Sequence, residues 1–450
     1  MPTRSWQTVC ELGELLDTRA RIIPKAIRVF LSRQVSQIKE GGGPAVRRKV
    51  RTVVIETAKL PFQMLGVLLA IPVVLVVRII RPIKLVRFGA LRSDLIGHMV
   101  FDSEYYLSER ETLEEHSLDL FYFQTRLVPN SFYPEMLRRH FRISPIYRYM
   151  DKLNRMIPNG ELHHKIPCTT NSRDIQGYLT RTKTHISFTK QEDRSGASFL
   201  KTVGMGLDDR FVCLLVRDSA YKTARSKDLG QQKDWTYHEY RDSDIDTYSQ
   251  AALALAERGY WIFRMGKRVH KPFKVDHPRI LDYANSEYRS DFLDIWLMAN
   301  CFFCISTGTG LDEVSRVFRR PAVKVNYLPI QHISSYSADV TAPKRLYWIG
   351  SGQELTLTEH LRANYLSSQQ YQDAGIGIKD LDSGEILSAV WEMISREEGW
   401  WPSGKDSIDR QNQFWKIMQS SPEWTTYHGV VHPKAYVSDY FIKKNSLWLQ

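Results

Sequence analysis

The sequence predicts an α/β protein in which two Rossmann-like modules face a cleft, preceded by a helical extension. Over residues 260–327, short apolar runs alternate with helical patterns, which implies a parallel sheet with right-handed crossovers. A similar alternation occurs over 84–124, and the pattern restarts at a buried-looking run over 211–216 after a polar stretch, 171–205, that is typical of a linker. We therefore expect four parts: a basic helical region with an apolar anchor over 1–80, a first module over 81–205, a second module over 206–398, and an aromatic tail over 399–450 that packs back on the first module.

The second module contains the clearest elements. Its predicted strands are Phe211–Val216, Trp261–Arg264, Cys301–Ile305 and Pro321–Val325, and its predicted helices are Ile245–Arg258, Phe292–Asn300, Leu311–Arg319 and Ser383–Arg396. A Gly-rich loop, Ser306-Thr307-Gly308-Thr309-Gly310, directly follows the third of these strands. Such a loop, followed by a helix, can present unpaired N–H groups to a phosphate. The alternative is an ordinary β–α turn, because the loop is neither a Walker A motif nor a clear dinucleotide fingerprint.

Charge is concentrated near the start of the chain. The formal net charge is +12, and residues 1–59 carry 12 Lys and Arg against 5 acids, a local excess of +7. Leu60–Val77 then runs for 18 residues without a charge, at the lower limit of the roughly 17–25 residues that a spanning helix needs. Pro61, Pro72 and basic residues on both flanks favour an anchor that lies in an anionic membrane interface. A spanning helix and a buried core helix are the alternatives.

The five cysteines form an odd and sparse set, which is typical of a reduced, cytoplasmic chain. Cys301 and Cys304 have the C-x-x-C spacing but lie inside a predicted buried strand, so we expect them to pack in the core. No signal peptide is recognisable, because the first apolar segment starts too late in the sequence.

Basic residues also follow two other predicted strands of the second module. Arg217-Asp218 comes after one strand, and Arg264-Met265-Gly266 ends another. An arginine at this edge can bind a pyrophosphate, and Asp218 can orient it or accept a proton. Structural ion pairs are the alternative for both arginines.

Further candidates lie near predicted helix starts. In the first module, Arg87, Gly89 and Gly97 form a β–α turn before His98, which is a candidate general base, although a lone histidine is more often structural. In the second module, Ser290, Asp291 and Glu313 are candidates for contacts to a ribose or a sugar hydroxyl. Capping is the alternative for Ser290 and Asp291.

The order of these motifs resembles a bacterial glycosyltransferase family that is tied to surface-carbohydrate gene clusters. The resemblance covers roughly Lys84 to Met393. It rests on Arg87-x-Gly89, Gly97-His98, Val216-Arg217-Asp218, Tyr240-Arg241-Asp242, Gly259-Tyr260, Arg264-Met265-Gly266, residues 288–294, Thr307–Gly310 and Phe318–Pro321. The Gly-rich loop also distantly resembles that of heptosyltransferases, and the arginines at strand ends resemble those of fucosyltransferases.

The resemblance implies a GT-B fold and a nucleotide-sugar donor, with no cofactor and no metal. We expect a glycosyltransferase that is peripheral or monotopic on the cytoplasmic side of the inner membrane and glycosylates a surface glycan or lipid-linked acceptor. The alternative is a non-catalytic adaptor of the same fold in a polysaccharide assembly complex. A nucleic-acid partner is not expected, because no recognised nucleic-acid-binding module is visible.

Overall fold

The computed structural model describes residues 25–125, 127–228 and 236–450. The first 24 residues of the basic extension lie outside the described residues. The chain forms two compact units, residues 1–76 and 77–450.

The first unit consists largely of helix α2, Lys25–Ile79, whose last residues extend into the second unit. Gly42 interrupts the helical backbone with φ 55° and ψ −149°, so α2 is two helical segments joined at a kink. Beyond the kink, apolar side chains including Met64, Leu68 and Leu69 are more than half exposed. Among the described residues, no helix has both the length and the apolar character required to cross a membrane.

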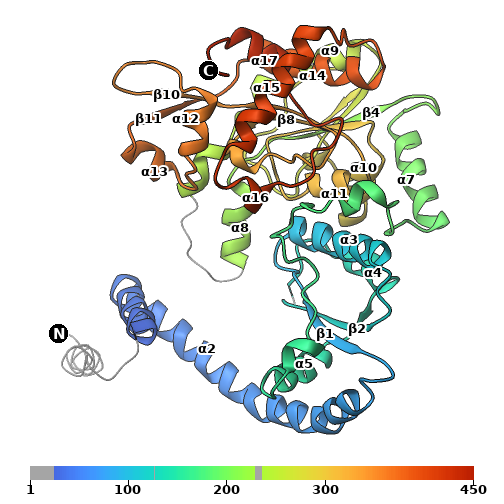
Figure 1. Ribbon diagram of the computed structural model, residues 1–450, viewed down its shortest axis with the longest axis vertical. Coiled ribbons are helices and arrows are strands. Elements are labelled where there is room, and N and C mark those ends of the chain that lie inside the picture. Colours follow the sequence, from blue (N-terminus) through green and yellow to red (C-terminus); the bar gives the residue numbers. More distant parts are fainter. Residues whose placement is uncertain (1–24, 126, 229–235) are drawn as a thin grey trace. The chain divides into compact units, whose positions relative to one another are not determined.

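The second unit begins with a small parallel sheet. Strands β1 (Val86–Leu91), β2 (Leu118–Phe123) and β3 (Arg142–Ile143) pair in that order. These strands confirm the two that the sequence predicts at 84–89 and 118–124. Helix α3, Ile96–Thr112, connects β1 to β2 and packs on α11 (Asp312–Val317) of the second module (Figure 1). The other helices of this part are α4 (Tyr133–Arg138), α5 (Tyr147–Arg155), η1 (Gly160–His163) and α6 (Tyr178–Arg181).

The larger sheet has seven parallel strands in the order β12-β9-β8-β7-β4-β5-β6. Their bounds are β4 Phe211–Leu215, β5 Trp261–Arg264, β6 Ile280–Leu281, β7 Phe303–Ser306, β8 Ala322–Tyr327, β9 Asp339–Pro343 and β12 Tyr436–Val437. Strands β4, β5, β7 and β8 confirm the predicted parallel β/α module. The fold class is therefore mixed α/β with parallel sheets.

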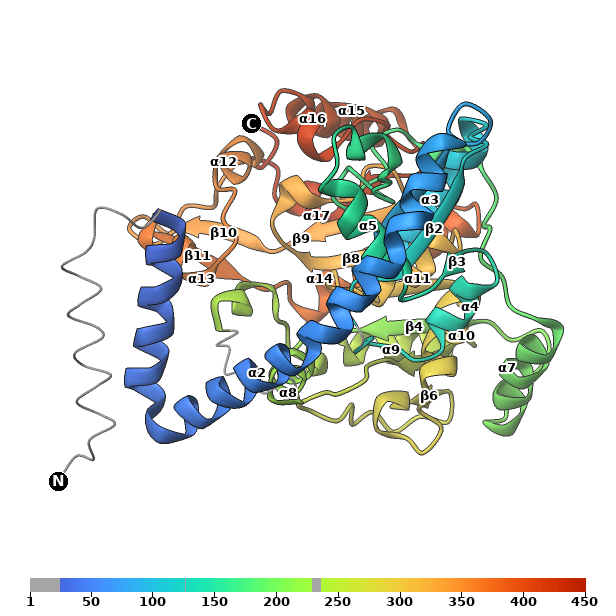
Figure 2. The same cartoon turned by 90° about the horizontal axis from the view of Figure 1, so that it is seen from below.

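Helices connect successive strands of this sheet along the chain (Figure 2). They are α8 Ala220–Asp228, η2 Thr236–Arg241, η3 Ile245–Tyr248, α9 Ser249–Glu257, η4 Tyr283–Asn285, α10 Asp291–Asn300, α11 Asp312–Val317, η5 Ile330–His332 and α14 Ser383–Glu397. A separate antiparallel pair, β10 (Arg345–Trp348) and β11 (Ile376–Lys379), lies close to α12 (Leu357–Arg362) and α13 (Ser368–Asp373).

Two predictions about connecting segments need correction. The expected linker over 171–205 contains helix α7, Lys190–Thr202, which begins with a capping box between Thr189 and Glu192. The tail forms α15 (Lys405–Gln419), α16 (Trp424–Tyr427) and α17 (Asp439–Lys444), and its strand β12 extends the seven-stranded sheet. Its Val430 does donate a backbone hydrogen bond of 3.1 Å to Ile175 in the first module, but Phe414, Phe441 and Trp448 pack in the core of the second.

The two modules share an apolar core. One buried cluster contains Val100 and Phe121 from the first module together with Phe263 and Leu297 from the second. Because α3 packs on α11 through this cluster, the modules are joined along α3, and the expected cleft between them stays a prediction.

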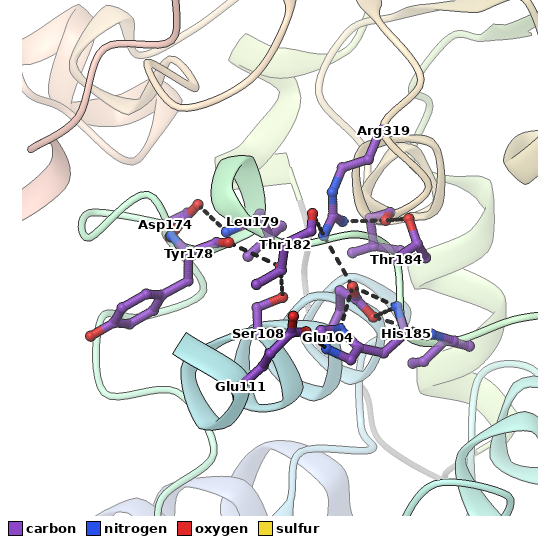
Figure 3. Close-up of polar contacts among 12 residues, drawn as sticks. Glu104, Ser108, Glu111, Asp174, Tyr178, Leu179, Thr182, Thr184, His185 and Arg319 are labelled. Carbon is purple, nitrogen blue, oxygen red and sulfur yellow. Dashed lines mark hydrogen bonds and ion pairs between the residues drawn. The ribbon is translucent and has the colours of Figure 1, made fainter. Parts of the chain in front are cut away.

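A buried carboxylate adds a polar connection at the same junction (Figure 3). Glu104 on α3 is fully buried and accepts hydrogen bonds from the backbone N–H of His185 at 3.1 Å and from the Arg319 guanidinium at 3.1 Å. The His185 ring lies 3.2 Å from Glu104 through Nδ1 and 2.6 Å from Glu111 through Nε2. Arg319 belongs to the Phe318–Pro321 motif, so that part of the motif joins the modules.

Candidate active site

The carboxyl ends of β4 and β7 bring together two of the predicted groups. Leu215 of β4 pairs with Ser306 of β7, so Arg217 and the Gly-rich loop leave the sheet side by side. The backbone N–H of Arg217 donates to Thr307 Oγ1 at 2.9 Å. The prediction that parallel strands collect these residues at one edge is thus correct for this pair.

The Gly-rich loop uses most of its own donors internally. The N–H of Thr307 donates to the Leu215 carbonyl at 3.3 Å, that of Gly308 donates to Ser306 Oγ at 3.0 Å, and that of Thr309 donates to the Asp312 carboxylate at 3.1 Å. Asp312 also forms a buried ion pair with Lys324. The expectation of unpaired loop amides is therefore wrong for these three, because a carbonyl of β4, a hydroxyl of the loop itself and an acid at the start of α11 each accept from one of them.

Gly308 is required at its position for two reasons. Its φ of +80° lies in the left-handed region, and a Cβ there would lie 2.6 Å from the ring of Tyr327. Its carbonyl accepts a hydrogen bond of 2.7 Å from the guanidinium of Arg241. The loop therefore positions an arginine by means of a carbonyl oxygen.

Two arginines, Arg217 and Arg241, contact this loop, and a third, Arg173, lies near Arg241 at His332. Arg217 lies 3.0 Å from Asp242, and burial together with the nearby charge of Arg241 lowers the pKa of Arg217. Arg173 donates to the His332 carbonyl at 3.4 Å and lies over the ring of Tyr427 at 4.9 Å. Besides burial, the positive charges of Arg173 and Arg241 both contribute to lowering the pKa of His332, so both arginines lie near this histidine.

Positive charge exceeds negative charge in this arginine cluster, defined as Arg173, Arg217 and Arg241. Asp242 is paired with Arg217, and among the described residues no carboxylate lies within 4.0 Å of the guanidinium of Arg173 or Arg241. The Nε atom of Arg241 is buried and has no hydrogen-bond partner. Because a buried donor without a partner is costly, this arrangement favours an anionic ligand.

His332 lies beside the cluster as a neutral ring. Burial, followed by Arg173 and Arg241, lowers its pKa to about 3. Its Nε2 is buried without a partner, and its ring centroid lies 4.5 Å from that of Tyr427. His332, Tyr427, Arg173 and Arg241 were not among the predicted site residues. The sequence signal for Arg241 was its motif, Tyr240-Arg241-Asp242.

His98 is held by two residues that the sequence analysis missed. Its Nδ1 lies 2.6 Å from Ser172 Oγ, and Ser172 Oγ donates to Asp102 Oδ1 at 2.6 Å. Burial, followed by the charge of Arg92, lowers the pKa of His98 to about 4, so its ring is neutral at pH 7. His98 lies in the first turns of α3, next to Gly97, which meets Gly310 of the Gly-rich loop.

Glu313 and Asp218 have internal partners. Glu313 forms bonds of 2.6 Å to Arg316, one turn further along α11. Asp218 accepts from the N–H of Ala220 at 3.0 Å and from that of His270 at 2.9 Å. The catalytic role of Asp218 and the sugar contact of Glu313 stay predictions, and neither side chain is needed for the site described here.

The predicted donor residues of the β5 edge, Arg264 and Gly266, follow a strand that pairs directly with β4. Arg264 is 1% exposed and donates to Asp282 and to the Lys271 carbonyl, each at 3.1 Å. Arg264 therefore has the internal ion pair that was its alternative explanation, and its role in binding a donor stays a prediction. Gly266 follows it with φ +153°.

Ser290 caps α10, and Asp291 is an acid of its first turn, which was the alternative explanation for the pair. Ser290 Oγ accepts from the N–H of Leu293 at 3.1 Å. Asp291 accepts from the N–H of Ser131 at 2.8 Å and pairs with Lys267 at 3.0 Å, so it holds a loop of the first module on α10.

The predicted acceptor-side residues Arg87 and Gly89 also serve packing. Arg87 binds both oxygens of Asp119 at 2.8 Å, and Glu115 is a second acidic partner. At Gly89, a Cβ would clash with the carbonyl of Lys165 and the ring of Phe121. Among the described residues, no group of three or more His, Cys, Asp or Glu side chains is arranged to hold a metal ion. Metal-independent transfer stays a prediction.

Comparisons with known proteins give similarities of structure only. No protein-family model matches the chain, and no curated protein matches it. Similar solved structures include a glycosyl transferase of family 9 from Veillonella parvula DSM 2008, at 10% identity and a TM-score of 0.37, covering 58% of this chain and 86% of that one. The E. coli ADP-heptose lps heptosyltransferase II has 10% identity and a TM-score of 0.36, covering 69% of this chain and 99% of that one.

The E. coli heptosyltransferase WaaC with ADP has 11% identity and a TM-score of 0.27, covering 57% of this chain and 90% of that one. These are structures of glycosyltransferases, in keeping with the type of protein that the motifs resemble. Because TM-scores this low do not establish a common fold, we infer function from the side chains.

Proposed function

We propose that this protein is a glycosyltransferase that takes a sugar from a nucleoside diphosphate and attaches it to a hydroxyl of a surface glycan or lipid-linked acceptor. One observation carries the proposal. The arginine cluster has Arg217 and Arg241 at the carboxyl edge of a parallel sheet and Arg173 beside them on His332, and Asp242 is the carboxylate paired within it. A diphosphate supplies the negative charge that this arrangement lacks, and guanidinium groups bind its oxygens in bidentate fashion.

The reaction that follows from this site needs a leaving group and a base. The bond between the sugar C1 and the diphosphate oxygen breaks, and the bond between C1 and the acceptor oxygen forms. The departing diphosphate takes the electron pair, and Arg173, Arg217 and Arg241 stabilise its charge. The acceptor hydroxyl gives its proton to His98, whose neutral ring has an available Nε2.

The location that we propose is the cytoplasmic face of the inner membrane. Three observations support it: the apolar side chains exposed on α2, the uncharged run Leu60–Val77, and the basic residues on both sides of that run. Apolar side chains in the interface and cations near anionic head groups together suit a peripheral or monotopic protein.

A transfer assay tests the proposal. The full-length protein is incubated with UDP-, GDP-, ADP- and CMP-linked sugars, and release of the nucleotide is measured with and without a glycan or lipid-linked acceptor. We expect release from one donor class, and a roughly 100-fold or greater loss in His98→Gln, in line with removal of a general base.

His116→Gln is the matched control, because His116 is exposed, and we expect it to keep full activity. The non-catalytic adaptor remains the second candidate. It predicts nucleotide binding without release in every mixture, including those with acceptor, and that result would reject the proposed transfer.

A further inference from the structure

Ser172 lies between an imidazole and a buried acid. Its hydroxyl is 2.6 Å from His98 Nδ1 and donates to Asp102 Oδ1, also at 2.6 Å. A hydroxyl has one proton, and here Asp102 receives it. Nδ1 of His98 must therefore carry a hydrogen that Ser172 accepts, which leaves the lone pair on Nε2.

The backbone at this point is held in an unfavourable conformation. Asn171 and Ser172 have φ values of 53° and 61°, in the left-handed region. This region is sterically unfavourable for a residue with a Cβ, although asparagine tolerates it better. Strained residues of this kind persist where the surrounding structure fixes them, and they cluster at functional sites.

Asp102 accepts the last hydrogen bond of the chain that runs from His98 through Ser172. It lies one helical turn after His98 on α3, and it is 2% exposed. Its nearest cation is Arg92, whose Nε lies 4.0 Å away. The negative charge of Asp102 is thus available to stabilise a positive charge on His98, transmitted through the hydroxyl of Ser172.

We propose that Ser172 and Asp102 are positioning residues that hold His98 with Nδ1 protonated and Nε2 free to accept a proton from the acceptor hydroxyl. When Nε2 takes that proton, the imidazolium keeps its Nδ1–H bond to Ser172, and Asp102 offsets the new charge. The role in transfer rests on the proposed function, whereas the hydrogen-bond arrangement does not.

The direct test observes the ring itself. Full-length protein labelled with ¹⁵N-histidine is studied by long-range ¹H–¹⁵N NMR near pH 7.5, and His98 is identified by the signals lost in His98→Gln. We expect wild-type His98 to be protonated on Nδ1. In Ser172→Gly, which keeps the left-handed backbone favourable while it removes the hydroxyl, we expect the hydrogen to move to Nε2 in a large fraction of molecules.

Asn171→Gly is the matched control, since it changes the same turn without touching the hydroxyl, and we expect it to keep the Nδ1–H form. Wild-type protein protonated on Nε2, or Ser172→Gly that retains Nδ1–H, would overturn the inference. If transfer is found, Ser172→Gly should lower kcat at least tenfold with KM nearly unchanged, and an unchanged kcat would count against the catalytic role. If no transfer is found, the proposed function fails, and the NMR result still decides the arrangement of the ring.

Discussion

Gly97 and Gly310 meet where α3 of the first module approaches the Gly-rich loop of the second. A Cβ on Gly97 would lie 3.1 Å from the Cα of Gly310, and a Cβ on Gly310 would lie 3.1 Å from the N of Gly97. This approach brings the start of α3, which carries His98, against the Gly-rich loop whose Gly308 carbonyl accepts a hydrogen bond from Arg241. The two glycines are therefore needed for close packing between the modules.

Adding a methyl group at this contact should destabilise the protein. We expect Gly97→Ala and Gly310→Ala each to lower the free energy of unfolding by about 1–3 kcal/mol, the usual range for overpacking. Denaturant unfolding measures this change. Gly350→Ala is the control, because a Cβ there meets no atom within 4 Å. Equal stability of all three variants would mean that the modules do not meet at these glycines.

The carboxylate of Glu104 should be far more important than that of Glu111. Glu104→Ala leaves Arg319 and His185 without their buried acid, and loss of one partner of a buried ion pair costs about 3–5 kcal/mol. The Glu111 side chain is 60% exposed, so Glu111→Ala should cost less than about 1 kcal/mol. Thermal unfolding of the two variants compares them, and similar losses would contradict a buried junction at Glu104.

Stability should fall as the pH falls below 6.5. Burial is the largest cause that lowers the pKa of four imidazoles: to about 4 in His98 and His428, and to about 3 in His332 and His360. Between these values and 6.5, the unfolded chain binds more protons than the folded chain, so acid favours unfolding. Groups with a raised pKa act in the opposite direction; among them are Asp102, whose pKa burial raises to about 6, and His185, whose pKa is raised by its hydrogen bond with Glu104.

One of these histidines provides a specific test of the pH dependence. His360 is 2% exposed and packs against Trp448. In His360→Phe, the loss of stability between pH 7.5 and pH 5 should be smaller than in the wild type by about 1–2 kcal/mol. His116 is exposed, so His116→Gln should lose as much stability between pH 7.5 and pH 5 as the wild type does. Urea unfolding at both pH values supplies the measurement, and a wild-type protein that is more stable at pH 5 would contradict the expected sign.

Apolar side chains of α2 should control binding to membranes. Leu68 and Leu69 are 59% and 60% exposed, and burying a leucine gains about 1.5–3 kcal/mol, so Leu68→Asp with Leu69→Asp should weaken binding more than tenfold. The measurement is co-sedimentation with vesicles that contain phosphatidylglycerol. Leu207→Asp is the control, because Leu207 is fully exposed outside this helix. Equal sedimentation of the double variant and the wild type would reject α2 as the binding surface.

Long apolar runs made much of the fold predictable from the sequence. Strands β4, β5, β7 and β8 lie where buried runs alternate with helical patterns. The two-residue strands β6 and β12 are too short to show a period, so nothing in the sequence distinguished them from loops. Helix α7 was missed although Thr189 and Glu192 have the spacing of a capping box.

The candidate site was less predictable, because it depends on contacts between residues that are far apart in the sequence. The sequence placed Arg217, the Gly-rich loop and His98 near the ends of strands, and the structure brings them together. The sequence did not indicate that Arg264 would be buried against Asp282, since an arginine at a strand end can either bind a ligand or form a structural ion pair. Ser172 gave no signal, because its importance depends on a backbone angle and on contacts to α3, 70 and 74 residues away in the chain.

The most direct test of the central claim is a calorimetric titration of the full-length protein with pyrophosphate, ADP, GDP and UDP. We expect at least one nucleoside diphosphate to bind. Arg241→Ala should weaken this binding about 10- to 100-fold, as expected for loss of hydrogen bonds from a charged donor. The exposed Arg362→Ala should bind like the wild type. No binding of any of these ligands, or undiminished binding in Arg241→Ala, would contradict a diphosphate site in the arginine cluster.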